Sequence, residues 1–284
     1  MSTAVLGLQV VLWLWTGSTP ESVGPCLGLD VMGRRVEELP FPVGEELDYR
    51  LTFGGAYVGR FEAKVGAPRT HGRSAVIPLF GRARTNALVA SFKPFVGRYI
   101  TMVDPESFLP IGTKTEVTYG DDPRWEDVHF SQDRKTIEAS FRSNGREGRR
   151  VYRSPHPATD ILTLMFWSRL LKLKEGAEAC QDVFSARRLW RMTGVVKGIS
   201  EVRTPVGKRK ARQVDLHFIR RPTPGLSKTH PPEFDFTVFL ANDAYQTPLE
   251  FRFTLEGVSA RGRLERWSFG KDPSRWVFEE NQTP

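Results

Sequence analysis

The sequence predicts a mainly β protein, a single domain of strongly curved antiparallel sheet (a half-barrel or open barrel) with one buried apolar helix. Residues 248–256 alternate without interruption between apolar and polar side chains, so Leu249, Phe251 and Phe253 share one face of a strand. The same alternation recurs between turn signals at intervals of roughly 8–12 residues, as in sandwiches, barrels and curved meanders. One long apolar run, residues 161–171, has no such alternation and is the predicted helix.

The chain of 284 residues divides into four predicted segments. They are residues 1–25 (a signal peptide or N-terminal apolar segment), 26–40 (an extension), 41–270 (the β-rich domain) and 271–284 (a polar tail). The apolar run of residues 4–15 is shorter than the roughly 20 residues that cross a bilayer, and it matches the core of a secretory signal. We therefore expect an exported protein of the periplasm or cell envelope, without a transmembrane helix in the mature chain. The alternative is a buried N-terminal strand or helix.

The two cysteines, Cys26 and Cys180, both follow the predicted signal segment. In an oxidising compartment they are able to form a disulfide, which would tie the mature N-terminus to the middle of the chain. Lipidation of Cys26 and two free thiols are the alternatives.

The first predicted hairpin joins residues 46–53 to residues 60–65 through the glycine pair Gly54-Gly55. Further strands with weaker alternation follow it, at residues 73–85, 97–103, 112–119, 125–130, 135–141 and 148–153.

The predicted helix begins after Asp160, because Thr159 or Asp160 is suited to cap its first amides. Apolar side chains cover almost its whole circumference, which indicates burial on most sides. Residues 86–92 are expected to form a shorter second helix.

Strands resume after Gly176, at residues 181–191, 195–202, 212–220, 234–240, 248–256 and 259–269. The strand of residues 248–256 is expected to pair with residues 259–269.

The formal net charge of +8 comes mainly from arginines dispersed over many strands. Aromatic residues do not alternate with them as in single-strand binders, so we expect no nucleic-acid partner. Solvated outer strand faces explain the dispersion best. An anionic partner is the alternative.

No motif in the sequence points to catalysis or to a cofactor. The five histidines are scattered without metal-ligand spacing, and no phosphate loop, dinucleotide fingerprint or nucleophile elbow occurs. We expect a protein that is not an enzyme, with no cofactor and no metal. Asp121, Asp122, Glu126 and Asp127 are interpreted as an acidic hairpin tip. A hydrolase whose carboxylates come together only on folding is the remaining enzymatic alternative.

The segment Phe41-Pro42-Val43-Gly44-Glu45-Glu46-Leu47-Asp48-Tyr49, with Gly59 after it, resembles the opening of a family of exported bacterial proteins, domain of unknown function 3108. Three later landmarks follow in the family's order: residues 156–162, the turn at residues 204–207, and residues 239–243 before Pro248-Leu249. One departure is Tyr245-Gln246-Thr247-Pro248, where family members usually show Arg-x-Pro. The resemblance implies export and a β-rich fold, and it implies no reaction.

By analogy of architecture, the pattern resembles half-barrel periplasmic carriers of lipids and lipoproteins. We therefore expect an apolar or amphiphilic ligand, a lipid or lipoprotein moiety, between the concave sheet and the helix. The predicted lining residues are Met165, Phe166, Phe236, Phe251 and Phe253. The alternative is a packed envelope scaffold that binds a protein or an anionic glycan through its arginine-rich face.

Overall fold

The computed structural model describes residues 42–143, 145–170, 174–221, 233–255 and 257–269. Its first half contains the strands β1 (Glu45–Phe53), β2 (Ala56–Val65), β3 (Arg69–His71), β4 (Ser74–Thr85), β5 (Phe95–Val103), β6 (Pro110–Tyr119), β7 (Asp122–Phe130), β8 (Thr136–Ser143) and β9 (Arg146–Arg153). Its second half contains β10 (Ala158–Asp160), β11 (Glu178–Ser185), β12 (Arg188–Thr204), β13 (Gly207–Arg220), β14 (Glu233–Ala241), β15 (Pro248–Leu255) and β16 (Val258–Phe269). The helices are α1 (Ala87–Ala90), α2 (Ile161–Trp167) and the 3-10 turn η3 (Ser168–Leu170).

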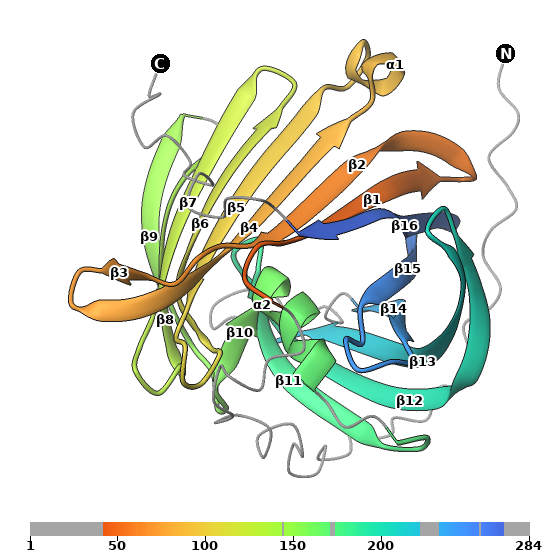
Figure 1. The fold of residues 1–284 in the computed structure, drawn as a ribbon. Coiled ribbons are helices and arrows are strands. Elements are labelled where there is room, and N and C mark those ends of the chain that lie inside the picture. The colour runs from red at the N-terminus through yellow and green to blue at the C-terminus, as the bar shows by residue number, and fades with distance from the viewer. Residues whose placement is uncertain (1–41, 144, 171–173, 222–232, 256, 270–284) are drawn as a thin grey trace, which may run out of the picture.

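The strands form one curved, open sheet of 16 strands (Figure 1). Their order is β10-β11-β12-β13-β14-β15-β16-β1-β2-β4-β5-β6-β7-β8-β9, with β3 paired to β4 beside this path. The first and last strands, β1 and β16, therefore pair in the middle of the sheet, whereas β9 and β10 form its edges. The predicted fold class is confirmed. The predicted pairing of residues 248–256 with residues 259–269 is the β15–β16 hairpin, and β10 with β11 is a parallel exception to the antiparallel pattern.

Helix α2 lies inside the curve of the sheet, between its two halves (Figure 1). Asp160 is its N-cap, and the carboxylate accepts hydrogen bonds from the amides of Leu162 and Thr163. Five of its seven residues are buried, as expected from an apolar circumference. The four apolar ones among them pack in a core with side chains of β1, β2, β4, β12 and β16. The predicted second helix is the single turn α1, capped by Asn86. No helix in the described part of the chain is long and apolar enough to cross a membrane.

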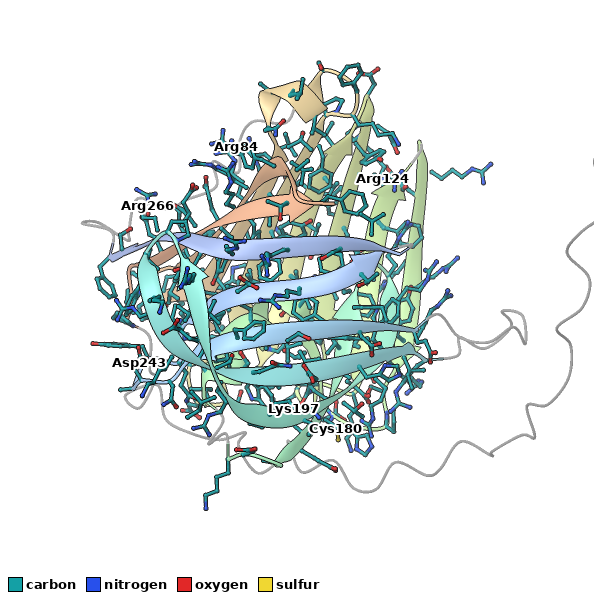
Figure 2. All side chains as sticks on the ribbon, turned by 90° about the vertical axis from the view of Figure 1, so that its right-hand side faces the viewer. Arg84, Arg124, Cys180, Lys197, Asp243 and Arg266 are labelled. Carbon is teal, nitrogen blue, oxygen red and sulfur yellow. The ribbon has the colours of Figure 1, made fainter. Side chains whose placement is uncertain are left out.

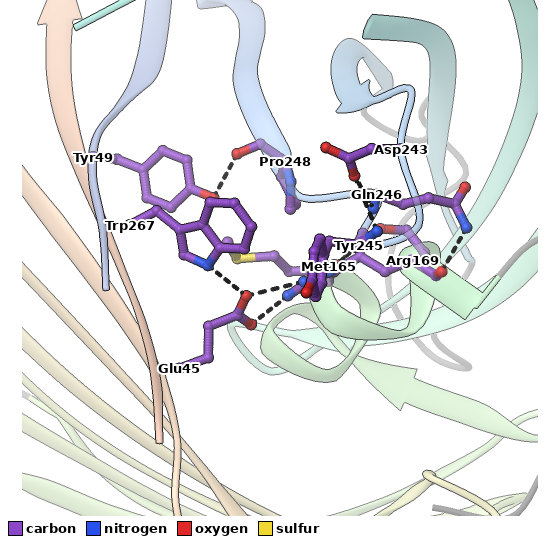
Figure 3. Close-up of polar contacts among 10 residues, drawn as sticks. Glu45, Tyr49, Met165, Arg169, Asp243, Tyr245, Gln246, Pro248 and Trp267 are labelled. Atoms are coloured by element: carbon purple, nitrogen blue, oxygen red, sulfur yellow. Dashed lines mark hydrogen bonds and ion pairs between the residues drawn. The ribbon is translucent and has the colours of Figure 1, made fainter. Parts of the chain in front are cut away.

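A buried ion pair fastens the end of this helical segment to the sheet (Figure 3). Arg169 of η3 donates to both carboxylate oxygens of Glu45, at 2.5 and 3.0 Å, and neither side chain is exposed to solvent. The indole of Trp267 also donates to Glu45, at 2.8 Å. Arg169 donates in addition to the carbonyl of Tyr245, and its own carbonyl accepts from Gln246. Arg169 thus ties the helix to β1 and to the β14–β15 loop, and Glu45 in turn joins β16 through Trp267.

Gly59 in β2 lies against the backbone of β4. The β1–β2 register shifts between Leu51 and Thr52, which leaves Val58 without a partner in a β-bulge. A Cβ atom at Gly59 would lie 2.2 Å from the carbonyl oxygen of Arg84 in β4. Because that oxygen belongs to the backbone, it has no side-chain freedom to move away.

Gly59→Ala is therefore expected to lower the free energy of unfolding by about 1–3 kcal/mol, the usual effect of overpacking. Urea denaturation would measure the change. Gly198→Ala is the matched control, because a Cβ there meets only the end of the flexible Glu175 side chain, at 3.5 Å. Equal stability of the two variants would contradict this explanation of Gly59.

Candidate ligand cavity

A cavity of about 310 Å³ lies on the concave face of β5–β8, beside the start of α2. One row of residues in register, Tyr99, Thr115, Glu126 and Phe141, crosses its four strands. Strand alternation points the members of such a row to the same face. Apolar side chains from the neighbouring rows, from α2 and from β11 complete the walls, among them Phe95, Val117, Val128, Leu162 and Phe184. This combination of apolar walls and a few polar groups is typical of small-molecule sites.

Glu126 is the charged group of this row. Its side chain is only 16% exposed. Burial raises the pKa of Glu126 to about 7, although the guanidinium of Arg187, 3.9 Å away, lowers it. The carboxyl therefore changes its charge near neutral pH, inside a largely apolar cavity.

Arg187 reaches the cavity from the two-residue turn between β11 and β12. Its guanidinium stacks 4.6 Å from the ring centroid of Phe141, a contact that stabilises a cation over an aromatic face. Ala186 and Arg187 both have positive φ, 50° and 57°, as a type I′ hairpin turn requires. Residues other than glycine hold that conformation at a cost, and Tyr152 braces the turn by donating to the carbonyl of Arg187. The turn thus holds a cation against the row.

Where the cavity meets the start of α2, its polar side chains form hydrogen bonds with one another and with the helix. The hydroxyl of Thr101 donates to Asp160 at 3.0 Å and lies 3.2 Å from the hydroxyl of Thr113. Asp160 accepts four hydrogen bonds in all, from Thr101, Thr163 (amide and hydroxyl) and the Leu162 amide. Burial raises the pKa of Asp160, and these hydrogen bonds oppose the shift. Its oxygens serve the helix and the sheet, whereas the Glu126–Arg187 pair faces the cavity, together with Arg124 and Arg142 of its wall.

The five predicted lining residues lie elsewhere on the concave side, and none of them lines this cavity. Phe166 is fully buried in the core, and Met165 packs against that core. Phe236 stacks on Phe251 and on Phe253, with centroids 5.8 and 5.9 Å apart. These three rings belong to a run of aromatic contacts across β2, β1, β15, β14, β13 and β12, formed with Phe61, Tyr49, Phe218, Phe234 and Trp190. The role of these five residues in lining a ligand stays a prediction.

The interpretation of Glu126 as part of an acidic hairpin tip is wrong. Asp122 lies at the β6–β7 turn, but Glu126 is four residues further along β7 and faces the cavity. Asp127 points to the other face, where it lies 3.5 Å from His129. The alternation Arg124, Glu126, Val128 in β7 was the signal that would have placed Glu126 correctly.

Two further predictions concern a disulfide and a metal site. Cys180 is buried in β11, and Cys26 lies outside the described residues, so the disulfide stays a prediction. Among the described side chains, no group of three His, Cys, Asp or Glu residues is placed to hold a metal ion.

The arginines of the outer face form a row in register across four adjacent strands: Arg263, Arg50, Arg60 and Arg84. Arginines directly opposite one another repel. Carboxylates beside the row reduce that repulsion. Glu265 lies 3.9 Å from Arg50 and 3.0 Å from Arg60, while Glu250 and Glu62 lie near Arg263 and Arg84.

The comparison with protein families matches residues 48–260 to the model of a protein of unknown function, DUF3108. This match spans most of the sequence, so the chain belongs to that family. Among curated proteins, none matches the sequence.

Solved structures support the fold. A β-barrel-like protein of domain of unknown function DUF1849 from Brucella abortus matches with a TM-score of 0.54 and 12% identity, covering 84% of this chain and 99% of its own. A Bacteroides fragilis protein, described as a candidate exported protein with a YmcC-like fold, has a TM-score of 0.34 and 8% identity, with 84% and 99% covered. A candidate lipoprotein from Parabacteroides distasonis has a TM-score of 0.34 and 10% identity, with 81% and 98% covered. Only the first likeness is strong enough to bear on the fold.

Proposed function

We propose that this member of the DUF3108 family is a non-enzymatic protein of the bacterial envelope that binds an amphiphilic ligand in the cavity of β5–β8. The cavity itself carries the proposal. Its volume of about 310 Å³ lies at the lower end of the usual range for small-molecule sites, roughly 300–1,000 Å³. Aromatic and aliphatic walls suit an acyl chain or another apolar group, and Glu126 with Arg187 suits a polar head.

The contacts of the two acids in the cavity wall, Asp160 and Glu126, favour ligand binding over hydrolysis. A hydrolase of the dispersed-carboxylate type needs two carboxyl groups free to act on the substrate. Asp160, the second acid of the cavity wall, uses its carboxylate to cap α2 and to accept from Thr101. Glu126 alone remains, beside a cation and without a second free acid among the residues that line the cavity.

The arginine row of the outer face favours the alternative, a scaffold that binds a protein or an anionic glycan. Glu250, Glu62 and Glu265 neutralise part of that row, however, and its side chains are 42–50% exposed, so salt screens it strongly. The cavity, by contrast, combines apolar walls with the partly buried pair Glu126 and Arg187. We therefore place ligand binding first and the outer face second.

Thr115→Trp is expected to weaken ligand binding at least about tenfold, because the indole would occupy the middle of the cavity row. The probe is a fluorescent long-chain fatty acid titrated into delipidated protein, with native mass spectrometry of the protein as purified. Thr118→Trp is the matched control, since Thr118 lies on the same strand with its side chain exposed on the opposite face. No uptake by the wild type, or equal uptake by Thr115→Trp, would overturn the proposal.

A further inference from the structure

Exposed apolar side chains gather at one end of the sheet. Phe92 and Leu88, at the α1 turn, are 82% and 73% exposed, more than any other large hydrophobic side chain in the described ranges. Four others at the ends of neighbouring strands are also exposed: Phe53, Val96, Tyr119 and Trp125. Figure 1 shows α1 standing at this end, at the tips of β4 and β5. We call the loop of residues 86–94 the α1 tip.

Side-chain hydrogen bonds hold the α1 tip in one conformation. The side chain of Asn86 accepts from the amide of Val89 and donates to the carbonyl of Tyr57 in β2. The hydroxyl of Thr85 accepts from the amide of Phe95, which closes the loop at its base. The hydroxyl of Ser91 donates to the carbonyl of Leu88. These bonds hold the exposed side chains of Leu88 and Phe92 at a fixed place. Large apolar side chains gathered in solvent indicate an interaction site.

The basic residues around the α1 tip favour an anionic partner. Residues 82–100, which include the end of β4, the tip and most of β5, contain four basic residues and no acidic one: Arg82, Arg84, Lys93 and Arg98. Acidic side chains of neighbouring strands lie beside two of them, because Glu62 is 4.0 Å from Arg84 and Glu116 is opposite Arg98 in β6. In the β6–β7 turn, Asp122 pairs with Arg124 at 2.8 Å. Lys93 belongs to the tip itself. Arg84 and Arg124 lie below α1 in Figure 2. Apolar side chains at an apex with basic residues behind them match the interface of an anionic bilayer.

We propose that the α1 tip docks this protein on an anionic lipid surface. Leu88 and Phe92 enter the interfacial region, while Lys93, Arg84 and Arg98 face the lipid head groups. The cavity extends to the same end of the sheet, since its lining includes Phe95, which follows the tip directly, as well as Val117 and Arg124. Docking would therefore bring this end of the cavity to the membrane, a consequence that rests on the proposed ligand binding; docking itself does not.

Vesicle flotation tests the proposal with two lipid compositions, phosphatidylcholine alone and phosphatidylcholine with phosphatidylglycerol. We expect wild-type protein to bind the vesicles that contain phosphatidylglycerol and to bind less as salt rises. Leu88→Ser with Phe92→Ser should weaken binding by at least tenfold, since each buried side chain contributes about tenfold. Ile199→Ser is the control, because Ile199 is 53% exposed on β12, away from the tip. Equal binding by the double variant would overturn the proposal, as would a wild type that stays free of both vesicle types.

A site-specific probe separates the tip from any other membrane contact. Ser91 at the tip and Ser74 at the opposite end of β4 are both exposed, so Ser91→Cys and Ser74→Cys form a matched pair for an environment-sensitive dye. The parent protein, treated identically, supplies the background from native cysteines. We expect vesicles to increase the emission of the Ser91→Cys label and not that of Ser74→Cys; the same response at both positions would contradict docking through the tip. Thr115→Trp should still dock and the tip variant should still bind soluble fatty acid, so each proposal is able to fail alone.

Discussion

Replacing Arg169 with methionine is expected to lower the free energy of unfolding by about 3–5 kcal/mol, the usual cost of breaking a buried ion pair. The variant leaves the carboxylate of Glu45 fully buried, with the indole of Trp267 as its remaining donor among the contacts drawn in Figure 3. It also removes the bond to the carbonyl of Tyr245 that holds the β14–β15 loop. Chemical denaturation followed by circular dichroism would measure the change.

A double variant separates the unpaired charge from the lost packing. Arg169→Met combined with Glu45→Gln removes both charges, and it should be more stable than Arg169→Met alone, because no buried carboxylate is left unpaired. The control is Arg142→Met, which breaks an exposed pair with Glu147 and should cost less than about 1 kcal/mol. Similar losses from Arg169→Met and Arg142→Met would contradict the anchoring role of the buried pair.

Glu126→Gln is expected to stabilise the protein at pH 8 by roughly 3 kcal/mol and to have little effect at pH 4. The folded state holds the proton of Glu126 up to a pKa of about 7, whereas the unfolded chain releases it near 4.5. The protonated side chain therefore carries no penalty below the unfolded value. As pH rises from about 4.5 to about 7, the folded state loses stability relative to the unfolded state, at about 1.4 kcal/mol for each pH unit. Above that window the loss is complete.

The measurement is a series of urea unfolding curves between pH 4 and pH 8.5, for wild type and variant. The difference between the two should grow only inside this window. Glu116→Gln is the control, because Glu116 is an exposed carboxyl of β6 on the opposite face of the sheet. A difference that does not depend on pH would show that Glu126 is not held protonated by burial. If the effect appears, the chain retains a destabilising acid in its cavity, which is expected of a functional group and not of a packing one.

The sequence shows several residues of the opening family motif only as a pattern. The structure shows the conformation or contact that each of them provides. Gly44 has φ of 92°, a conformation that favours glycine. Glu45 is the buried partner of Arg169. Tyr49 donates to the carbonyl of Pro248, 199 residues away in the sequence, and burial raises its pKa well above the ordinary value. Because each of these contacts joins distant segments, no local spacing in the sequence reveals them.

The alternation of side chains predicts which residues face the concave side of the sheet, but it does not predict which part of that side is a cavity. Alternation alone assigned Phe236, Phe251 and Phe253 to the concave face, and they do stack together there. Whether such a face is packed or leaves a cavity depends on the size of the side chains that pack against it. Gly262, for example, leaves room for the ring of Phe251, because a Cβ atom at that position would lie 2.0 Å from it. Beside β5–β8, small side chains such as Thr115 and Val117 leave the space open.

The sequence by itself determined the class of the fold, because a period of two is a local property that each strand carries independently. It also determined the family and the helix that begins after Asp160, since a cap and an apolar run are local signals. Only the tertiary structure decided which part of the concave face is a cavity and that Arg187 meets Glu126 there, 61 residues apart in the chain. The curvature of the sheet brings those residues together, and curvature is the sum of many small twists that no single segment encodes.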